Sequence, residues 1–176
     1  MHLNRLRLKG YLKIRDIPLG FDSSEALFFR KDLPILRDTQ ANVITDVGLM
    51  ESAKILVGLS ADNFDFMAIG DRGVNPSNLD IPLAPSPFDV GLINELNRKM
   101  IGSKSVTGST LNLAATFLTA EGPFSFADPL EEIVNEFSIQ TLSAGGVCIA
   151  RKTFPSIPFG TGDRTGIILE WSIVLE

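Results

Sequence analysis

The sequence contains very little of the two residue types on which most nucleophilic and metal sites depend. Its 176 residues include one histidine, His2, and one cysteine, Cys148. A Ser-His-Asp or Cys-His arrangement would have to use His2, and one thiol with one imidazole cannot complete a structural zinc site. An internal disulfide is excluded for the same reason. We therefore expect a protein that is not an enzyme and that needs no cofactor or metal.

Long hydrophobic runs and an excess of cations are also absent. No apolar stretch approaches the roughly 18 residues of a membrane-spanning helix, and the start has no hydrophobic signal region. The net charge of −5 and the pI near 4.9 provide no general attraction for nucleic acid. We expect a soluble, non-secreted protein with no membrane or nucleic-acid partner. The hydrophobic fraction of 44% excludes wholesale disorder, and the length suits one folded unit.

The charges are unevenly distributed along the chain. Residues 1–40 hold eight Lys or Arg against five Asp or Glu, whereas residues 41–176 hold eight against sixteen. Over 6–9 and 12–15, leucine or isoleucine alternates with Lys or Arg, which predicts a strand with cations on one face. Residues 1–40 are therefore either the first hairpin of the main sheet or an extended basic arm laid on a neighbouring subunit. The five acidic residues dilute the charge that a nucleic-acid arm would need.

Two segments have the spacing of short helices. Thr45 or Asp46 can cap the first, and Gly58 can close it. Its apolar residues make one stripe: Val47, Leu49, Met50, Ala53, Leu56 and Val57. The second helix is predicted over 89–99. Its inward residues would be Val90, Ile93 and Leu96, and Glu95 would meet Arg98 across one turn.

The remaining pattern is typical of strands. Segments 64–69, 110–117, 147–154 and 167–175 are apolar or alternate with period two, and Trp171 falls on the inward phase of the last. A loop over 74–88 holds four prolines, and a loop of that length is usually functional. We predict an α+β fold that is mainly antiparallel β and sandwich-like, with two short helices and an extended N-terminal arm. Residues 41–176 would form a single β-rich domain.

The candidates for chemistry are weak. Glu131, Glu132 and Glu136 are close in sequence, but any chain with 21 acidic residues offers such groups, and solvated faces and caps explain them. The glycine-rich stretch 160–166 lacks a Gly-Lys-Ser/Thr ending and precedes a strand, so we interpret it as a turn. Both interpretations favour contact with other proteins over catalysis.

Four features predict where such contacts would lie. The first is the set of basic residues at the start, and the second is a pair of aromatic residues in an irregular segment. The third is the Gly-Asp-Arg triplet, which occurs over 70–72 and again over 162–164 and leaves its arginine free for an intersubunit salt bridge. The fourth is the proline-rich loop. The predicted interface residues are Arg5, Arg7, Lys9, Lys13, Phe28, Phe29, Asp71, Arg72, Pro82 and Pro85.

The order of several motifs resembles a known family. Residues 45–49 read Thr-Asp-Val-Gly-Leu, residues 66–71 read Phe-Met-Ala-Ile-Gly-Asp, and residues 92–98 have the spacing Leu-x-x-Glu-x-x-Arg. Residues 145–154 read Gly-Gly-Val-Cys-Ile-Ala-Arg-Lys-Thr-Phe, and a strand around Trp171 follows. This order is similar to that of the N-terminal domain of tail-collar fibre proteins of tailed bacteriophages and of related small virion proteins. The resemblance covers about residues 44–176.

The resemblance implies a structural protein of the virion. Fibre proteins continue into a shaft and a receptor-binding tip, whereas this sequence ends at Glu176, so we expect an attachment module standing alone. It would act at the tail or baseplate as an adaptor, after assembly in the host cytoplasm. A capsid cement or decoration protein on the head is the alternative. By analogy its partners would be other virion proteins, tail or major capsid, and further copies of itself in a trimer or hexamer.

Two other classes make distinct predictions. A carbohydrate-binding tail module would expose Trp171 or Tyr11 beside carboxylates, although the inward phase of Trp171 predicts that it is buried. A nucleic-acid-binding packaging factor would turn the cations of residues 1–15 toward DNA and would bind with a steep dependence on salt.

Overall fold

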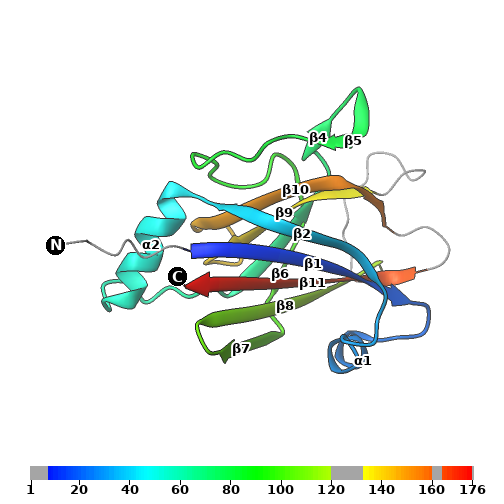
Figure 1. The fold of residues 1–176 in the computed structure, drawn as a ribbon, viewed down its shortest axis with the longest axis horizontal. Helices are drawn as coiled ribbons and strands as arrows, with labels where there is room; N and C mark the ends of the chain where they lie inside the picture. Colours follow the sequence, from blue (N-terminus) through cyan, green and yellow to red (C-terminus); the bar gives the residue numbers. More distant parts are fainter. Residues whose placement is uncertain (1–7, 120–132, 160–163, 176) are drawn as a thin grey trace.

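The structure is a computed structural model that describes residues 8–119, 133–159 and 164–175. It is mostly antiparallel β with two short helices, as predicted (Figure 1). The helices are α1 (Ser23–Phe28) and α2 (Asp46–Leu56). The strands are β1 (Leu8–Pro18), β2 (Ile35–Ile44), β3 (Phe66–Gly70), β4 (Val74–Asn75), β5 (Asn78–Pro82), β6 (Glu95–Met100), β7 (Ser103–Thr107), β8 (Thr110–Leu118), β9 (Ile133–Gln140), β10 (Cys148–Pro158) and β11 (Arg164–Leu175).

Nine strands form one curled sheet in the order β6-β3-β9-β10-β2-β1-β11-β8-β7. Its two end strands, β6 and β7, follow each other directly in the chain, and the Gly102 N–H between them donates to the Ala114 carbonyl (2.9 Å). In the middle of this order, β2 pairs with β1 over most of its length. Its last residues, Val43 and Ile44, pair with β10 instead. The sheet therefore turns back on itself and encloses a single main core.

The main core receives side chains from both halves of the sheet. Trp171 of β11 is fully buried, as predicted, and its ring meets the Phe137 ring of β9 edge to face, with centroids 6.0 Å apart. A smaller cluster lies on the outer side of the sheet, where Ala26 of α1 packs over Ile17 and Ile168. The helix thus covers one end of the outer face over β1, β11 and β8 and leaves the neighbouring part of these strands open.

The basic residues of β1 lie within the sheet. β1 pairs with β11 along its whole length and with β2 on its other edge, which is the placement that the hairpin interpretation of residues 1–40 requires. Leu12 and Ile14 point into the core, while Lys13 and Arg15 lie on the outer face, so the predicted alternation is confirmed. The predicted interface residues Arg5 and Arg7 lie outside the described residues.

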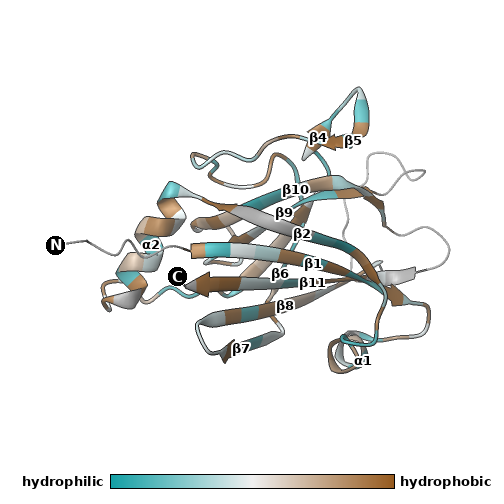
Figure 2. Ribbon diagram, viewed as in Figure 1, coloured by the Kyte–Doolittle hydropathy of each residue, from teal (hydrophilic) through white to brown (hydrophobic). Residues whose placement is uncertain are grey.

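The first predicted helix is confirmed, but four residues of its predicted apolar stripe are exposed: Val47, Leu49, Met50 and Val57. Thr45 caps α2 by accepting the Gly48 N–H (2.9 Å), and Gly58, with φ of 72°, follows its end. The part of α2 closest to β10 carries a small residue, Gly48, and a polar one, Ser52. A Cβ at Gly48 would collide with the Ile149 backbone of β10, and the Ser52 hydroxyl donates to the Gly48 carbonyl. Figure 2 shows hydrophobic residues along α2, and many of these are exposed.

The second predicted helix is wrong. Residues 95–100 form β6, paired with β3, and residues 86–94 form turns. The pairing with β3 overrides the helical spacing of the apolar residues. The predicted bond between Glu95 and Arg98 exists, but it joins two residues of a strand. The other short helix is α1, and its sequence signal is a capping box in which Asp22 and Glu25 satisfy each other's backbone N–H groups.

The proline-rich loop is also more ordered than predicted. Its first part forms the two-stranded sheet of β4 and β5, which lies against β10. The Ser156 hydroxyl of β10 donates to the Leu79 carbonyl (3.1 Å), and the Thr153 hydroxyl donates to the Leu83 carbonyl.

Candidate functional site

The open part of the outer face carries polar side chains in rows across five strands. The register of β2, β1, β11, β8 and β7 aligns one row, and a second row lies two residues away on β1, β11, β8 and β7. The first row is Asp38, Lys13, Glu170, Ala114 and Ser103. The second row is Tyr11, Ser172, Asn112 and Ser105. Because side chains alternate along each strand, both rows face away from the main core.

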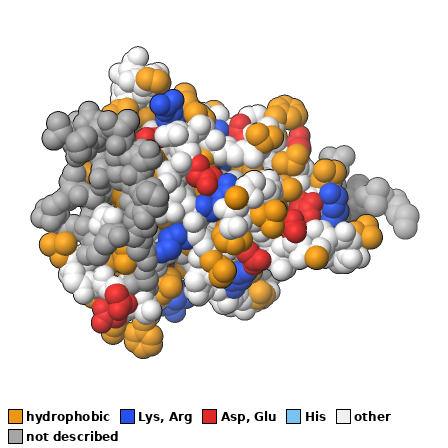
Figure 3. Space-filling model, turned by 180° about the vertical axis from the view of Figure 1, so that it is seen from behind, with side chains coloured by type: hydrophobic (Ala, Val, Ile, Leu, Met, Phe, Trp, Pro, Cys, Tyr) orange, Lys and Arg blue, Asp and Glu red, His pale blue; other side chains and the backbone are white. Residues whose placement is uncertain are grey.

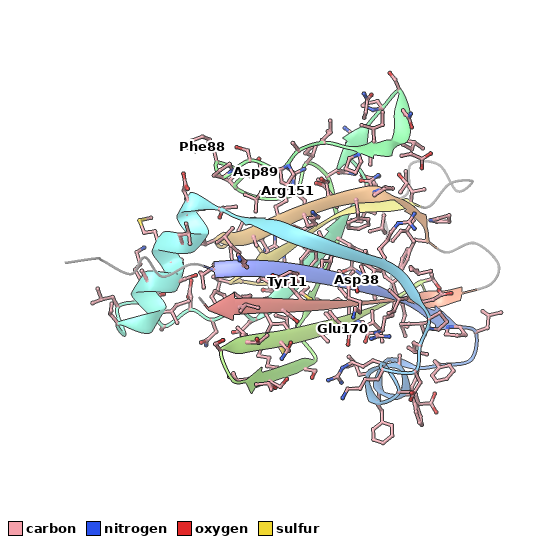
Figure 4. All side chains as sticks on the ribbon, viewed as in Figure 1. Tyr11, Asp38, Phe88, Asp89, Arg151 and Glu170 are labelled. Atoms are coloured by element: carbon pink, nitrogen blue, oxygen red, sulfur yellow. The ribbon has the colours of Figure 1, made fainter. Side chains whose placement is uncertain are left out.

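These rows form a groove of about 570 Å³, which we call the outer groove. The hollow exists because Ala114 and the short Ser172, Asn112 and Ser105 side chains lie between longer ones. Arg30 and Lys31, which follow α1, line it as well. Figure 4 shows Tyr11, Asp38 and Glu170 on this face of the sheet. The groove therefore combines strands from both ends of the sequence.

The charged groups of the outer groove are held by partners. Glu170 lies between two arginines, with Arg15 Nε 2.6 Å from Glu170 Oε2 and Arg30 Nε 3.3 Å from Glu170 Oε1. Arg15 is anchored further by a bond to the Leu33 carbonyl (2.9 Å). Lys13 Nζ lies 3.4 Å from Asp38 Oδ2. These contacts fix the positions of both carboxylates without placing them side by side as an acid-base pair.

A second candidate surface combines α2 with the following loop, and we call it the α2–loop surface. Its five members are exposed by between 36% and 80%: Val47, Leu49, Met50, Phe88 and Val90. The two segments adjoin, because the Asp46 N–H at the start of α2 donates to the Pro87 carbonyl (2.8 Å). Figure 4 shows Phe88 near the first turn of α2.

A buried ion cluster holds this loop in place. Glu136 of β9 is fully buried and accepts the backbone N–H groups of Ile93 (3.1 Å) and Asn94 (3.0 Å). Arg151 of β10 bonds Glu136 Oε2 through Nη2 (2.7 Å) and Asp89 Oδ2 through Nη1 (2.7 Å). Burial alone would lower the pKa of Arg151, but its bonds to Asp89 and Glu136 outweigh this and raise it. The cluster is fully paired, so we interpret it as structural.

An apolar pocket of about 260 Å³ opens beside the inner side of α2. Its lining includes Ser52 and Ile55 of α2, Phe64, and Val106 of β7. A hollow of this kind suits an inserted apolar side chain and lies at the same end of the molecule as the α2–loop surface.

The other predicted interface residues lie far apart in the chain and form no common site. Lys9 is exposed on β1, and Phe28 and Phe29 are exposed at the end of α1, where their rings meet edge to face. Asp71 is half-buried and accepts a bond from Asn94 (2.7 Å), whereas Arg72 is exposed. Pro82 is exposed and Pro85 is half-buried. Of the predicted set, the outer groove contains Lys13 alone among the described residues.

The described residues that the sequence offers for catalysis form no common site. Two of the glutamates, Glu131 and Glu132, lie outside the described residues, as does most of the glycine-rich stretch 160–166. The carboxylate of Glu136 is already bonded within the ion cluster. Burial raises the pKa of Cys148 to about 12, which keeps its thiol protonated. In the part of the chain that the structure describes, no three metal-ligating side chains gather and no helix is long and apolar enough to cross a membrane.

Sequence reasoning missed most of the outer groove. It named Tyr11 only as one of two aromatic residues that a carbohydrate-binding module would expose, and Tyr11 is in fact 36% exposed beside Asp38 and Glu170. The available signal was the polar phase of the alternating strands, such as Glu170 and Ser172 around Trp171. Comparisons with protein-family models, with curated proteins and with solved structures gave no match.

Proposed function

We propose that this chain is a structural protein of a tailed-bacteriophage virion that acts through protein-protein contacts, at the tail or baseplate as an adaptor. The observation that carries the proposal is the α2–loop surface. An apolar helix stripe normally faces the core of its own protein, and a contiguous exposed one is typical of an interface. Here the opposite side of α2 is already occupied by its close contact with β10. The order of motifs over residues 44–176 supports a virion protein as the partner.

The surface charge supports protein contact over nucleic-acid contact. On the face shown in Figure 3, acidic and basic side chains are interspersed, and neither sign forms a continuous field. On the opposite face, Lys13 is paired with Asp38, and Arg15 and Arg30 are paired with Glu170. Binding to DNA would need several uncompensated cations along one path.

The decisive experiment places charges on the α2–loop surface. The double variant Val47→Asp/Met50→Asp should fold normally, because both side chains are exposed, and should lose incorporation into phage particles by at least about tenfold. The matched control is Leu19→Asp, which also charges an exposed apolar residue but lies next to α1. Quantitative blotting of purified particles measures incorporation. Normal incorporation of the double variant would contradict the proposal.

Two further measurements separate the alternatives within this proposal. Fractionation of particles into heads and tails distinguishes the adaptor from the capsid decoration protein, for which all copies would remain with the heads. Mass determination in solution tests the expected trimer or hexamer. The hypothesis of a docking arm is tested by deleting residues 1–7, because a longer deletion removes β1 from between β2 and β11.

A further inference from the structure

The outer groove offers an unusual combination for a solvent-facing sheet. A solvated antiparallel face is expected to be polar, but this one is hollowed and carries one accessible aromatic ring among polar groups. Tyr11 is that ring, since Trp171 contributes to the lining with its side chain fully buried. A tyrosine exposed in this way offers an apolar ring face and a hydroxyl group that can donate and accept.

The groups beside Tyr11 are short donors and acceptors at fixed positions. In its own row, the Ser172 hydroxyl donates to Asn112 Oδ1 (2.7 Å), which orients both side chains. Ser105 extends the row on the exposed strand β7. Spaced hydroxyl and amide groups on a rigid sheet can bond a ligand that carries several hydroxyl groups without much loss of side-chain entropy.

The charge balance of the groove restricts the ligand further. The lining contains three cations, Lys13, Arg30 and Lys31, against two carboxylates, Asp38 and Glu170. Lys13 is paired with Asp38 and Arg30 with Glu170, which leaves one excess positive charge in the lining. One excess charge is too little to select a polyanion, and a polycation would meet the three lining cations. A lipid chain would leave the polar lining unsatisfied.

We propose that the outer groove is a binding site for a neutral saccharide, with a sugar ring stacked on Tyr11 and its hydroxyl groups bonded to the Ser172, Asn112 and Ser105 row. A neutral sugar has both an apolar C–H face and a rim of hydroxyl groups, which matches the ring and the row together. The site would bind without hydrolysis, because Glu170 is engaged by two arginines and Asp38 is paired with Lys13, so both carboxyl groups already have partners.

The chain supplies its own probe for this proposal. Tyr11 is the sole tyrosine in the sequence, so selective labelling of tyrosine gives ring resonances from one site. We would titrate the whole protein with glucose, galactose and N-acetylglucosamine, and with a linear trisaccharide of each. The expected result is a saturable shift of the Tyr11 resonances by at least one of these sugars, with tighter binding of the trisaccharide.

Variants distinguish stacking from a general effect. Tyr11→Ala should weaken binding by at least about tenfold, whereas Tyr11→Phe should keep most of it, since the ring face remains. Binding to these variants is followed by calorimetry, with unfolding curves confirming the fold. Ser105→Ala, at an exposed position, should weaken binding by about threefold, and Phe28→Ala near α1 should leave it unchanged.

Several outcomes would overturn the proposal. The first is that none of the six sugars shifts the Tyr11 resonances. The second is that dextran sulfate shifts them and none of the neutral sugars does. Equal binding by Tyr11→Ala and the unaltered protein would place the sugar elsewhere. Each of these results leaves the particle-incorporation experiment untouched, because the α2–loop surface shares no residue with the groove.

Discussion

The outer groove and the α2–loop surface differ in how their exposed side chains are held. In the groove, both carboxylates are paired with cations on the adjacent strand β1, and the backbone beneath them is fixed by the pairing of β1 with β2 and β11. On the α2–loop surface, apolar side chains face outward, and the loop beneath them is held by a buried ion cluster. The groove is therefore suited to a small polar ligand, whereas exposed apolar area gains free energy only when another surface covers it.

The largest effect is expected at the ion cluster under the loop. Glu136→Ala leaves Arg151 buried with half of its partners and leaves the Ile93 and Asn94 N–H groups without an acceptor. The free energy of unfolding should fall by about 3–5 kcal/mol. Denaturant unfolding measures it. As a control, Glu95→Ala removes the exposed pair with Arg98 and should cost less than about 1 kcal/mol. A loss below that value for Glu136→Ala would show that the loop is held by other contacts.

The next effect tests the close approach of α2 to β10. Helix propensity alone would make Gly48→Ala stabilising by about 1 kcal/mol, but the added Cβ meets the Ile149 backbone. We expect a net loss of about 1–3 kcal/mol and reduced incorporation into particles. Gly91→Ala is the matched control, since nothing lies within 4 Å of its added Cβ. Unchanged stability of Gly48→Ala would mean that α2 can move away from the sheet freely.

A third prediction uses Cys148, which lies under the start of α2, where its carbonyl accepts the Thr45 hydroxyl. Burial raises the pKa of this thiol from 9.0 to about 12, so the native protein holds the proton more tightly than the unfolded chain. This contribution to stability is complete below pH 9 and declines as the pH rises toward 12. Unfolding curves across this range should show the decline, and Cys148→Ala should reduce it. An equally steep decline in the variant would assign it to other groups.

The smallest effect is expected in the groove itself. Lys13→Met removes the partly exposed pair with Asp38, and stability should change by less than about 1 kcal/mol. Denaturant unfolding measures this change as well. A much larger loss would show that the groove contributes to stability as the ion cluster does, which would remove the contrast between the two regions.

The sequence predicted the bounds of α2 better than it predicted which residues pack against each helix or strand. Thr45 and Gly58 bounded α2 correctly because caps are local, but the outward direction of its apolar stripe depends on the Ile149 backbone, which lies far along the chain. The spacing of Val90, Ile93 and Leu96 predicted a helix because the pairing of β6 with β3 has no local signal. The outer groove could not be predicted from the sequence for the same reason. Tyr11, Ser172 and Asn112 become neighbours only through the register of three strands.

The pairing of β1 with β11 also bears on how the protein is made. Leu8 lies opposite Leu175, so β1 finds this partner only after β11 has left the ribosome. Until then β1 lacks the neighbour on one edge, and β8 lacks one as well. Contacts this distant in sequence slow folding and leave strand edges open to wrong pairing. A chain that lacks β11 would thus expose the edges of both β1 and β8.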